Sequence, residues 1–448
     1  MSGWPSWQWS SERPEPGRSG RPGFPMSTRR EFLIRSGQGL ASLAMLPGGT
    51  LFQEGARGTL TSKTPAPVAV SLDDKIGQMI LAGFWGMKLD PGNPILGDIR
   101  ERHIGGVVLF DYDVPSQSPV RNIKSPSQVK DLTEALKEAS PSPLLVAVDQ
   151  EGGKVSRLKE KFGFPATVSQ QSLGTRNDPE ATRKAAAETA TTLSECGFNI
   201  NFSPVVDLNI NPENPVIGGR ERSFSADPAD VTKHALEVIK AHHERGILTT
   251  LKHFPGHGSS KDDSHLGFVD VTETWSPTEL EPYEKIIAAG FCDTVMTAHI
   301  FNSKLDPSLP ATLSSRTIGG LLRDDLHFDD VVISDDMQMK AISAHSGFEE
   351  AVCLAIGAGV DILTFANNSV FDPDVAASAI GIIRKAVRDG RIGEERIDRS
   401  YARIMRLKAL LGKGAGSLPM KCPLLASRLA KPRHVLGPQG KARGDIRS

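Results

Sequence analysis

The chain has 448 residues, and its 52 basic and 53 acidic side chains nearly cancel. This balance excludes a protein-wide field that would attract nucleic acid or an anionic membrane surface, so a neutral or small polar substrate is the easier expectation. The four cysteines stand far apart, without CxxC spacing or the density of a disulfide scaffold, and we expect them to be free thiols.

The N-terminal part differs in composition from the rest. Residues 1–25 are rich in Pro, Gly, Ser and Trp without an apolar period, which predicts disorder or a start codon set too early. In residues 26–55, Arg29 and Arg30 precede a mildly apolar stretch of small residues, a pattern that resembles a twin-arginine export signal. A basic amphipathic helix is the alternative, because the stretch is too short and too Gly-rich for a stable membrane anchor. After a linker at residues 56–70, we expect a mature protein that works in the periplasm or outside the cell.

Beyond the linker, short apolar runs alternate with amphipathic segments. Eight runs have the length and composition of strands, at residues 80–84, 105–110, 144–149, 200–207, 247–254, 294–299, 331–336 and 361–365. Helical patterns that open on Ser or Asp caps lie between most of them. Continuous apolar runs flanked by helices indicate parallel strands buried on both faces. We therefore predict an α/β fold, a single (β/α)8 barrel of the TIM type with enlarged loops over residues 71–412, with a doubly wound open sheet as the alternative.

The C-terminal residues 413–448 are basic, punctuated by Pro and Gly, and weakly periodic. The segment is too short for a second domain with its own core, so we predict a flexible tail and expect no C-terminal α/β sandwich domain.

Charged and polar residues stand at the ends of five predicted strands. In chain order these residues are Asp149, Asp207, Lys252 with His253, His299, and Asp335 with Asp336. Barrel enzymes place catalytic groups at the carboxyl ends of their strands. Because all these ends share one rim, the pattern predicts a catalytic mouth rather than five solvated strand ends.

The segment "KHFPGHGSSKDDSH", residues 252–265, allows three interpretations. As a metal site it would offer His253, His257 and His265, but the Pro and Gly residues between them exclude the helix on which HxxxH spacing serves a metal. As a polar surface loop it would have no catalytic or metal-binding function. As an acid/base device it would pair Asp263 with His265, because the carboxylate orients the ring and raises its basicity.

Two other polar residues of this segment lie at the end of the predicted strand. Lys252 and His253 are placed to donate hydrogen bonds to sugar hydroxyls.

Asp335 follows an apolar run in "VVISDDMQM". A carboxylate at such a place is a nucleophile, a metal ligand or a buried structural ion. Hydrolysis of a glycoside with retention requires a carboxylate close to the anomeric carbon. We expect the neighbouring Asp336 to be structural.

Four stretches together carry a resemblance to a known family. They are "DQEGGKVSRL", "FSPVVDLN" followed by "NPENPVIGGRERSFSADP", "KHFPGHG" with "DDSHLG", and "VISDDMQM". Their order resembles the signature segments of the glycoside hydrolase family 3 β-N-acetylhexosaminidases of the NagZ-like type, over about residues 72–412. The resemblance implies retaining hydrolysis of terminal β-N-acetylglucosamine with no metal and no other cofactor.

The resemblance also implies roles for single residues. Asp335 is similar to the family's nucleophile, and His265, supported by Asp263, to its histidine acid/base. The implied sugar-binding set is Asp149, Arg157, Arg222, Lys252 and His253. Arg220 remains an alternative to Arg222, because both belong to "GGRERSF". His257 is expected to organise its loop.

The sequence thus predicts an exported β-N-acetylglucosaminidase that acts on small glycans such as peptidoglycan fragments or chitooligosaccharides. A β-glucosidase or β-xylosidase, a phosphorylase of the same fold, and a catalytically inactive glycan-binding protein are the alternatives. Nucleic-acid binding and stable membrane insertion are not expected.

Overall fold

The computed structural model describes residues 70–411, except for the side chains of residues 343–345. The predictions for the N-terminal extension, the export signal, almost all of the linker and the C-terminal tail lie outside the described residues.

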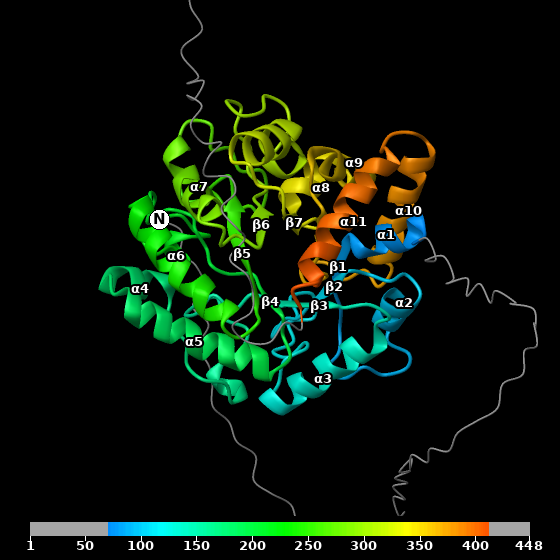
Figure 1. The fold of residues 1–448 in the computed structure, drawn as a ribbon, viewed down its shortest axis with the longest axis horizontal. Helices are drawn as coiled ribbons and strands as arrows, with labels where there is room; N and C mark the ends of the chain where they lie inside the picture. Colours follow the sequence, from blue (N-terminus) through cyan, green and yellow to red (C-terminus); the bar gives the residue numbers. More distant parts are fainter. Residues whose placement is uncertain (1–69, 412–448) are drawn as a thin grey trace, which may run out of the picture. The chain divides into compact units, whose positions relative to one another are not determined.

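The strands close into a parallel barrel in sequential order (Figure 1). They are β1 (Ile80–Gly83), β2 (Gly106–Val108), β3 (Leu145–Val148), β4 (Ile200–Asn201), β5 (Leu248–Phe254), β6 (Thr294–Thr297), β7 (Val331–Asp336) and β8 (Ile362–Phe365). The barrel closes where Ile80 of β1 pairs with Leu363 of β8. The predicted (β/α)8 barrel is therefore confirmed, and the open sheet is excluded.

Helices surround the strands as a ring in Figure 1. They are α1 (Leu72–Gln78), α2 (Pro94–Arg100), α3 (Pro126–Ala139), α4 (Gln170–Arg176), α5 (Pro179–Glu195), α6 (Pro228–His243), α7 (Glu281–Ala288), α8 (Lys340–Ser346), α9 (Phe348–Ala358), α10 (Val375–Arg388) and α11 (Glu394–Lys408). Between β6 and β7 the connection contains a π-helical segment, η5 (Arg316–Asp325), where the sequence pattern predicts a helix.

The predicted caps start three of the long helices. Ser125 Oγ accepts a hydrogen bond from the amide of Gln128 at the start of α3. Asp178 and Asp227 accept from amides in the first turns of α5 and α6. In each case a proline follows the cap at a position where its missing N–H costs nothing.

The fourth strand is shorter than predicted. The apolar pattern predicts a strand over residues 200–207, but β4 ends at Asn201. Pro204 cannot donate a ladder hydrogen bond, so the chain continues as a loop after β4. Val205 still forms an isolated parallel bridge with Lys252, and this bridge carries the loop toward the end of β5.

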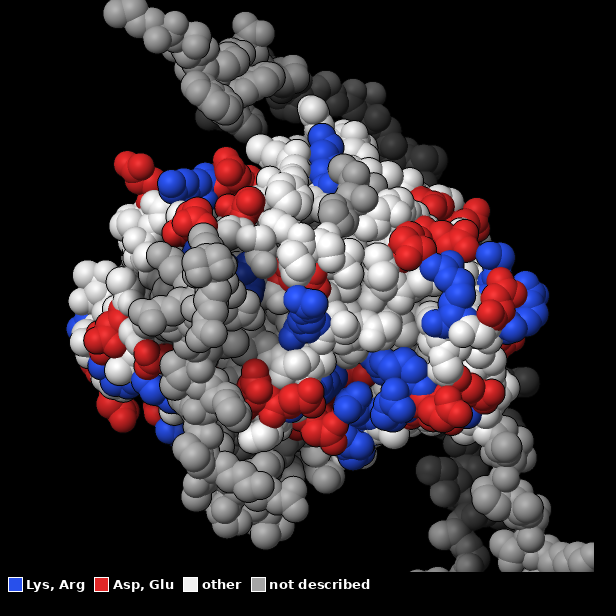
Figure 2. Space-filling model, turned by 90° about the horizontal axis from the view of Figure 1, so that it is seen from above, with Lys and Arg blue, Asp and Glu red and all other residues white. Residues whose placement is uncertain are grey.

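The described residues bear on the expectations about cysteines and charge. Cys196, Cys292 and Cys353 are buried thiols, whereas Cys422 lies outside the described part. Basic and acidic side chains are interspersed on the face drawn in Figure 2, without a broad area of one sign. Between residues 70 and 411 none of the helices combines the length and apolar character needed to cross a membrane.

Candidate active site

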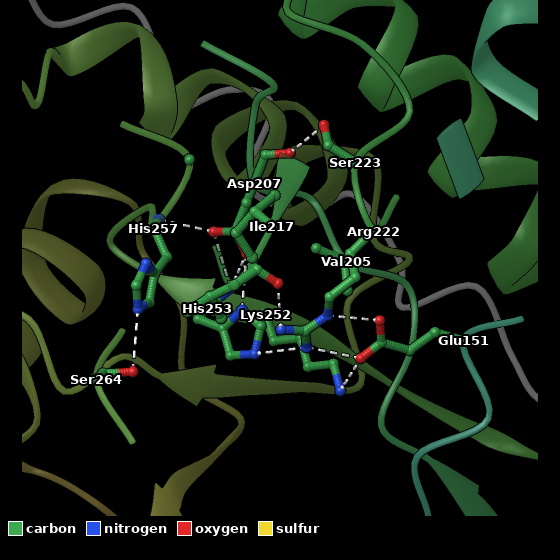
Figure 3. Close-up of polar contacts among 12 residues, drawn as sticks. Glu151, Val205, Asp207, Ile217, Arg222, Ser223, Lys252, His253, His257 and Ser264 are labelled. Carbon is green, nitrogen blue, oxygen red and sulfur yellow. Dashed lines mark hydrogen bonds and ion pairs between the residues drawn. The ribbon is translucent and has the colours of Figure 1, made fainter. Parts of the chain in front are cut away.

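The carboxyl ends of β3 and β5 bring charged side chains into one cluster. Lys252 Nζ lies 2.8 Å from Asp149 Oδ1 and 2.6 Å from Glu151 Oε1. Arg222 binds Glu151 with two parallel hydrogen bonds, 2.8 Å from Nε to Oε2 and 2.7 Å from Nη2 to Oε1 (Figure 3). The side chain of Glu151 is 0% exposed and that of Asp149 is 19% exposed, so Asp149 is the carboxylate that a ligand can reach.

Both carboxylates of this cluster are ionised. Burial alone would raise the pKa of Asp149, but the charges of Lys252 and Arg157 hold it below its usual value. Burial also opposes ionisation of Glu151, and the charges of Arg222 and Lys252 outweigh it, so its pKa is lowered. The cluster therefore offers fixed charges, with little capacity to exchange protons near neutral pH.

His253 is a neutral link inside this arrangement. Its Nδ1 lies 2.7 Å from Asp207 Oδ2, and its Nε2 lies 3.1 Å from Arg222 Nη2. Because a guanidinium only donates, Nε2 accepts, and Nδ1 carries the hydrogen that it donates to Asp207. Burial, with the charges of Arg222 and Lys252, lowers the pKa of His253 well below its usual value. That His253 binds the sugar stays a prediction. Its contact with Arg222 shows that the ring also orients the Arg222 guanidinium.

Asp207 is the buried anchor of the loop after β5. Its carboxylate accepts from the amide of His257 at 2.8 Å and from the amide of His253 at 3.1 Å, besides the His253 ring (Figure 3). The sequence placed Asp207 on the rim as a charged residue. In the structure, the Asp207 carboxylate accepts these hydrogen bonds from groups of the protein itself.

Asp335 and Asp336 end β7 with opposite surroundings. Asp335 is partly exposed, and its Oδ1 accepts from the amide of Asp336 at 2.8 Å. Asp336 is buried and accepts from the amides of Gln338 and Ala366. Burial raises the pKa of Asp336 to about 6. Backbone amides thus engage the Asp336 carboxylate, whereas the Asp335 side chain stays partly exposed.

Three histidines influence the pKa of Asp335. Burial would raise the pKa of Asp335, but interactions with His299, His253 and His265 lower it. His299 is buried and held in place, because its Nε2 donates to the carbonyl of Asp336 at 3.0 Å and its Nδ1 lies 2.8 Å from Thr312 Oγ1. Asp335 is therefore an ionised and reachable carboxylate.

The loop after β5 carries the predicted imidazole–carboxylate pair. His265 Nδ1 lies 2.7 Å from Asp263 Oδ1, and the His265 amide donates to the same oxygen at 2.8 Å. The side chain of His265 is 55% exposed. Because Asp263 occupies Nδ1, Nε2 is the nitrogen that can meet a substrate.

A second histidine fastens this loop to the barrel. His257 Nε2 lies 3.2 Å from Ser264 Oγ, and the His257 carbonyl accepts from Asn214 Nδ2 at 2.7 Å. Glu279 Oε2 accepts from the amide of Gly258 at 2.9 Å. The predicted loop-organising function of His257 agrees with these contacts, which Figure 3 shows in part.

The structure gathers most of the predicted residues and decides between two arginines. Asp149, Arg222, Lys252 and His253 form one cluster, and Arg157 borders it with Nη2 3.4 Å from Asp149 Oδ2. Arg220 is exposed, whereas Arg222 points into the cluster. Asp335 and the Asp263–His265 pair occupy other parts of the rim. His265 is one of the groups that lower the pKa of Asp335.

Sequence reasoning missed Glu151, which binds both Arg222 and Lys252. The signal was available in "DQEGG", where a second acidic residue follows Asp149 at the carboxyl end of a buried strand.

The histidines do not form a metal centre in the described structure. The rings of His253, His257 and His265 each contact a different side chain, Asp207, Ser264 and Asp263 respectively. Across residues 70–411, no group of three or more His, Cys, Asp and Glu side chains is arranged to hold a metal ion.

A closed (β/α)8 barrel with an ionised carboxylate, an imidazole–carboxylate pair and a binding cluster on one rim has the parts of a glycoside-cleaving enzyme. Residues 71–407 match the family model described as "Glycosyl hydrolase family 3 N terminal domain". The chain belongs to this family and is a glycoside hydrolase.

Similar proteins include curated relatives and solved structures. Beta-hexosaminidase A of Pseudoalteromonas piscicida is 32% identical over 413 residues, which cover 84% of this chain and 67% of the relative. Beta-hexosaminidase of Xylella fastidiosa (strain M23) is 37% identical over 304 residues, 66% of this chain and 86% of the relative. The structure of a family 3 beta-N-acetylglucosaminidase from Paenibacillus sp. str. FPU-7 is 35% identical with a TM-score of 0.70, over 80% of this chain and 67% of that one.

Proposed function

We propose that this protein is a retaining β-N-acetylglucosaminidase that removes terminal β-linked N-acetylglucosamine from small glycans such as peptidoglycan fragments or chitooligosaccharides. The names of the similar proteins support the sugar, since they are hexosaminidases and a β-N-acetylglucosaminidase. One observation supports the mechanism most directly. Asp335 is a partly exposed, ionised carboxylate on the same rim as an exposed imidazole that is oriented by Asp263.

In the first step, an oxygen of Asp335 attacks the anomeric carbon and the bond to the leaving oxygen breaks. His265, protonated, gives the Nε2 proton to that oxygen, so the leaving group departs as an alcohol. The products of this step are a glycosyl ester on Asp335 and a neutral imidazole.

In the second step, the neutral His265 takes a proton from water as the water oxygen attacks the anomeric carbon. The ester bond breaks, and Asp335 regains its carboxylate. Asp263 accepts the Nδ1 hydrogen throughout, which stabilises the imidazolium and keeps Nε2 directed at the substrate.

The charged cluster binds the sugar that is released. Asp149 is the reachable member, and a carboxylate accepts hydrogen bonds from two neighbouring hydroxyls. Lys252 and Arg157 form ion pairs with this carboxylate and hold it in place. Glu151 in turn binds Lys252 and Arg222 and positions them.

Nitrophenyl β-glycosides of N-acetylglucosamine, glucose and xylose test the substrate. The purified protein should have by far the highest kcat/KM for the N-acetylglucosaminide, and the free sugar should first form as the β-anomer. Faster turnover of the glucoside or xyloside, or initial formation of the α-anomer of the sugar, would contradict the proposal.

A phosphorylase is the second candidate. The observation that favours it is an imidazole, rather than a carboxylate, in the position of the acid/base group. A carboxylate at that position would repel an incoming phosphate, whereas a neutral imidazole does not. Reaction in phosphate buffer should produce free sugar if the protein is a hydrolase. Sugar 1-phosphate as the main product would support the phosphorylase instead.

Export is part of the proposal and rests on the Arg29–Arg30 pair in residues 26–55. Tagged full-length protein should be found outside the cytoplasm, and replacement of both arginines by lysine should retain it inside. Equal distribution of the two proteins would contradict export by a twin-arginine signal.

A further inference from the structure

Glu279 is a buried acid that contacts the loop carrying His265. It lies in the short helix η3 (Pro277–Leu280), directly before α7, and it is 0% exposed. Its Oε2 accepts a hydrogen bond from the amide of Gly258 at 2.9 Å. A side-chain carbon at Gly256 would lie only 2.6 Å from the Glu279 Cβ, so the loop backbone packs directly against this acid. Glu279 is thus a buried titratable group that the proposed reaction does not use.

A short series of contacts connects Glu279 to the acid/base pair. Gly258, which Glu279 binds, follows His257 in the chain. The His257 ring lies with Nε2 3.2 Å from Ser264 Oγ (Figure 3). Ser264 stands between the two members of the acid/base pair in the sequence. A displacement of the Gly258 amide would therefore pass through His257 and Ser264 to the imidazole that transfers the proton.

A second buried carboxylate lies in the same region, and it is better stabilised as an anion. Asp207 is 0% exposed and accepts from the amides of His253 and His257 and from the His253 ring. Glu279 Oε1, by contrast, is buried without a hydrogen-bond partner among residues 70–411. The strongest charge acting on Glu279 is that of Asp207, which has the same sign. Two neighbouring buried acids do not both ionise readily, and the one with fewer donors keeps its proton.

The pKa values agree with this division. Burial raises the pKa of Glu279 to about 7, and the charge of Asp207 acts in the same direction. Burial also raises the pKa of Asp207, but the charge of His257 and the amides of His257 and His253 act against it. Near neutral pH, Asp207 is therefore the anion and Glu279 is the acid that titrates.

The other titratable groups that face Glu279 stay neutral in this range. They are His257 on the loop after β5 and Tyr283 on α7. Burial lowers the pKa of His257 and raises that of Tyr283 well above its usual value. His257 Nδ1 and Tyr283 Oη are buried without hydrogen-bond partners in the described part of the chain. Both atoms can accept a hydrogen, which a protonated Glu279 has and an ionised one lacks.

We infer that Glu279 is a positioning residue for His265 and that it holds the loop after β5 in its protonated form. The neutral acid accepts from the Gly258 amide without placing a second negative charge beside Asp207. Loss of the proton adds this charge in a buried region, where like charges repel strongly, and weakens the anchored half of the loop. The imidazole then spends less time in its working position. This inference rests on the proposed function and adds to it a pH dependence that arises outside the reacting groups.

Glu279→Gln tests the inference, because the amide still accepts from Gly258 but cannot ionise. At pH 8, one unit above a pKa of about 7, only about a tenth of the wild-type molecules carry the proton. The ratio of kcat/KM of the variant to that of the wild type, measured with a disaccharide, should therefore rise by up to about tenfold from pH 6 to pH 8. With a dinitrophenyl glycoside the ratio should stay constant, because that leaving group needs little help from His265.

Thermal denaturation gives a second readout that does not depend on activity. The pKa of Glu279 is raised from 4.5, so between pH 4.5 and 7 the folded wild type binds more protons than the unfolded chain and loses stability as the pH rises. The melting temperature of Glu279→Gln relative to the wild type should therefore be higher at pH 8 than at pH 5. The matched control is Glu281→Gln, which removes a 42% exposed carboxylate paired with Lys285 and should change neither pH dependence.

Other results would overturn the inference. A ratio for the disaccharide that is the same at pH 6 and pH 8 would show that the proton on Glu279 does not position His265. An equal rise for both substrates would show that Glu279 supports the fold or Asp335 instead. In both cases hydrolysis by the wild type leaves the proposed function standing. If the wild type hydrolyses no glycoside, the proposed function fails and the positioning of His265 fails with it, while the melting temperatures still show whether Glu279 carries the proton.

Discussion

Glu151 and Asp335 are both carboxylates on the rim, but their partners give them different tasks. Both oxygens of Glu151 bond cations, Arg222 and Lys252, and its side chain is 0% exposed. Asp335 accepts one backbone hydrogen bond at Oδ1 and remains partly exposed. A carboxylate neutralised by two cations is a poor nucleophile, so the proposed mechanism assigns attack on the anomeric carbon to Asp335.

Asp335→Asn tests this assignment. The amide is nearly isosteric, so the variant should fold, but it cannot form the glycosyl ester, and the rate should fall by several orders of magnitude. Steady-state kinetics with a nitrophenyl N-acetylglucosaminide and circular dichroism give the two readouts. Activity within about tenfold of the wild type would contradict the assignment.

His265→Ala tests the proton transfer through its dependence on the leaving group. General acid catalysis contributes typically about 10²–10⁴-fold, so kcat/KM for a natural disaccharide should fall by roughly that factor. For a dinitrophenyl glycoside the loss should be far smaller, because the phenol leaves as a stable anion. The kcat for that substrate should still fall, with a burst of phenol, since in the proposed mechanism the imidazole also activates water.

Asp263→Asn should show a weaker form of the same pattern, because Asp263 bonds the ring rather than the substrate. Equal losses in kcat/KM for both leaving groups in His265→Ala would show that His265 only binds sugar.

Glu151→Gln tests the buried ion cluster. The variant leaves Arg222 and Lys252 with less compensating charge, and breaking a buried pair costs about 3–5 kcal/mol in the free energy of unfolding. We expect this loss in urea denaturation, together with a raised KM. The control is Glu134→Gln, which removes an exposed helix pair with Lys130 and should change the free energy of unfolding by at most about 0.5 kcal/mol. Similar effects of the two changes would contradict the assigned role.

At the scale of elements, the loop between β5 and α7 combines an anchored half with an exposed half. His257 bonds Asp207 through its amide and Ser264 through its ring, whereas His265 beyond it is exposed. Glu279 Oε2 accepts a hydrogen bond from the amide of Gly258 in the anchored half. Burial raises the pKa of Glu279 to about 7. The anchored half of the loop therefore holds the exposed imidazole of His265 in a defined position.

Ser264→Ala tests that anchoring. Loss of the hydroxyl frees the loop from His257, so the imidazole should spend less time in its working position. We expect kcat/KM for a disaccharide to fall clearly more than kcat/KM for a dinitrophenyl glycoside, with unchanged melting temperature. Ser264→Thr, which keeps the hydroxyl, is the control and should retain most activity. If Ser264→Ala affects both substrates equally, the contact has no part in proton transfer.

At the scale of the whole molecule, Lys408 joins the end of α11 to the start of the barrel. Lys408 is 1% exposed, and its Nζ donates to Gln78 Oε1 at 2.5 Å. Burial lowers the pKa of Lys408 from 10.5 to about 7. Between pH 7 and 10.5 the unfolded chain therefore binds more protons at this residue, so its contribution to stability rises with pH in that window.

Lys408→Met should accordingly raise the melting temperature, most of all below about pH 7, where the buried charge is fully present. The gain should shrink as the pH approaches 10. Thermal denaturation of both proteins at pH 6 and pH 9 provides the comparison, with the exposed Lys130→Met as control. A larger gain at pH 9 than at pH 6 would contradict the linkage.

The sequence determined the features that depend on neighbours along the chain. Apolar runs bounded by capped helices predicted the barrel, and polar residues after those runs predicted the rim. The Asp263–His265 pair was also predictable, because its partners stand two positions apart in a loop. Local patterns failed at β4, where Pro204 ends the strand early.

Tertiary structure alone decided the contacts that closure of the barrel creates. Glu151 meets Arg222 across 71 positions, which selects Arg222 over Arg220 and fixes the tautomer of His253. Arg121 meets Asn367 across 246 positions and joins the loops that follow β1 and β8. Such pairs have no spacing that a sequence pattern can reveal. They form because the parallel strands pair edge to edge until β8 reaches β1, and this brings loops from opposite ends of the chain together.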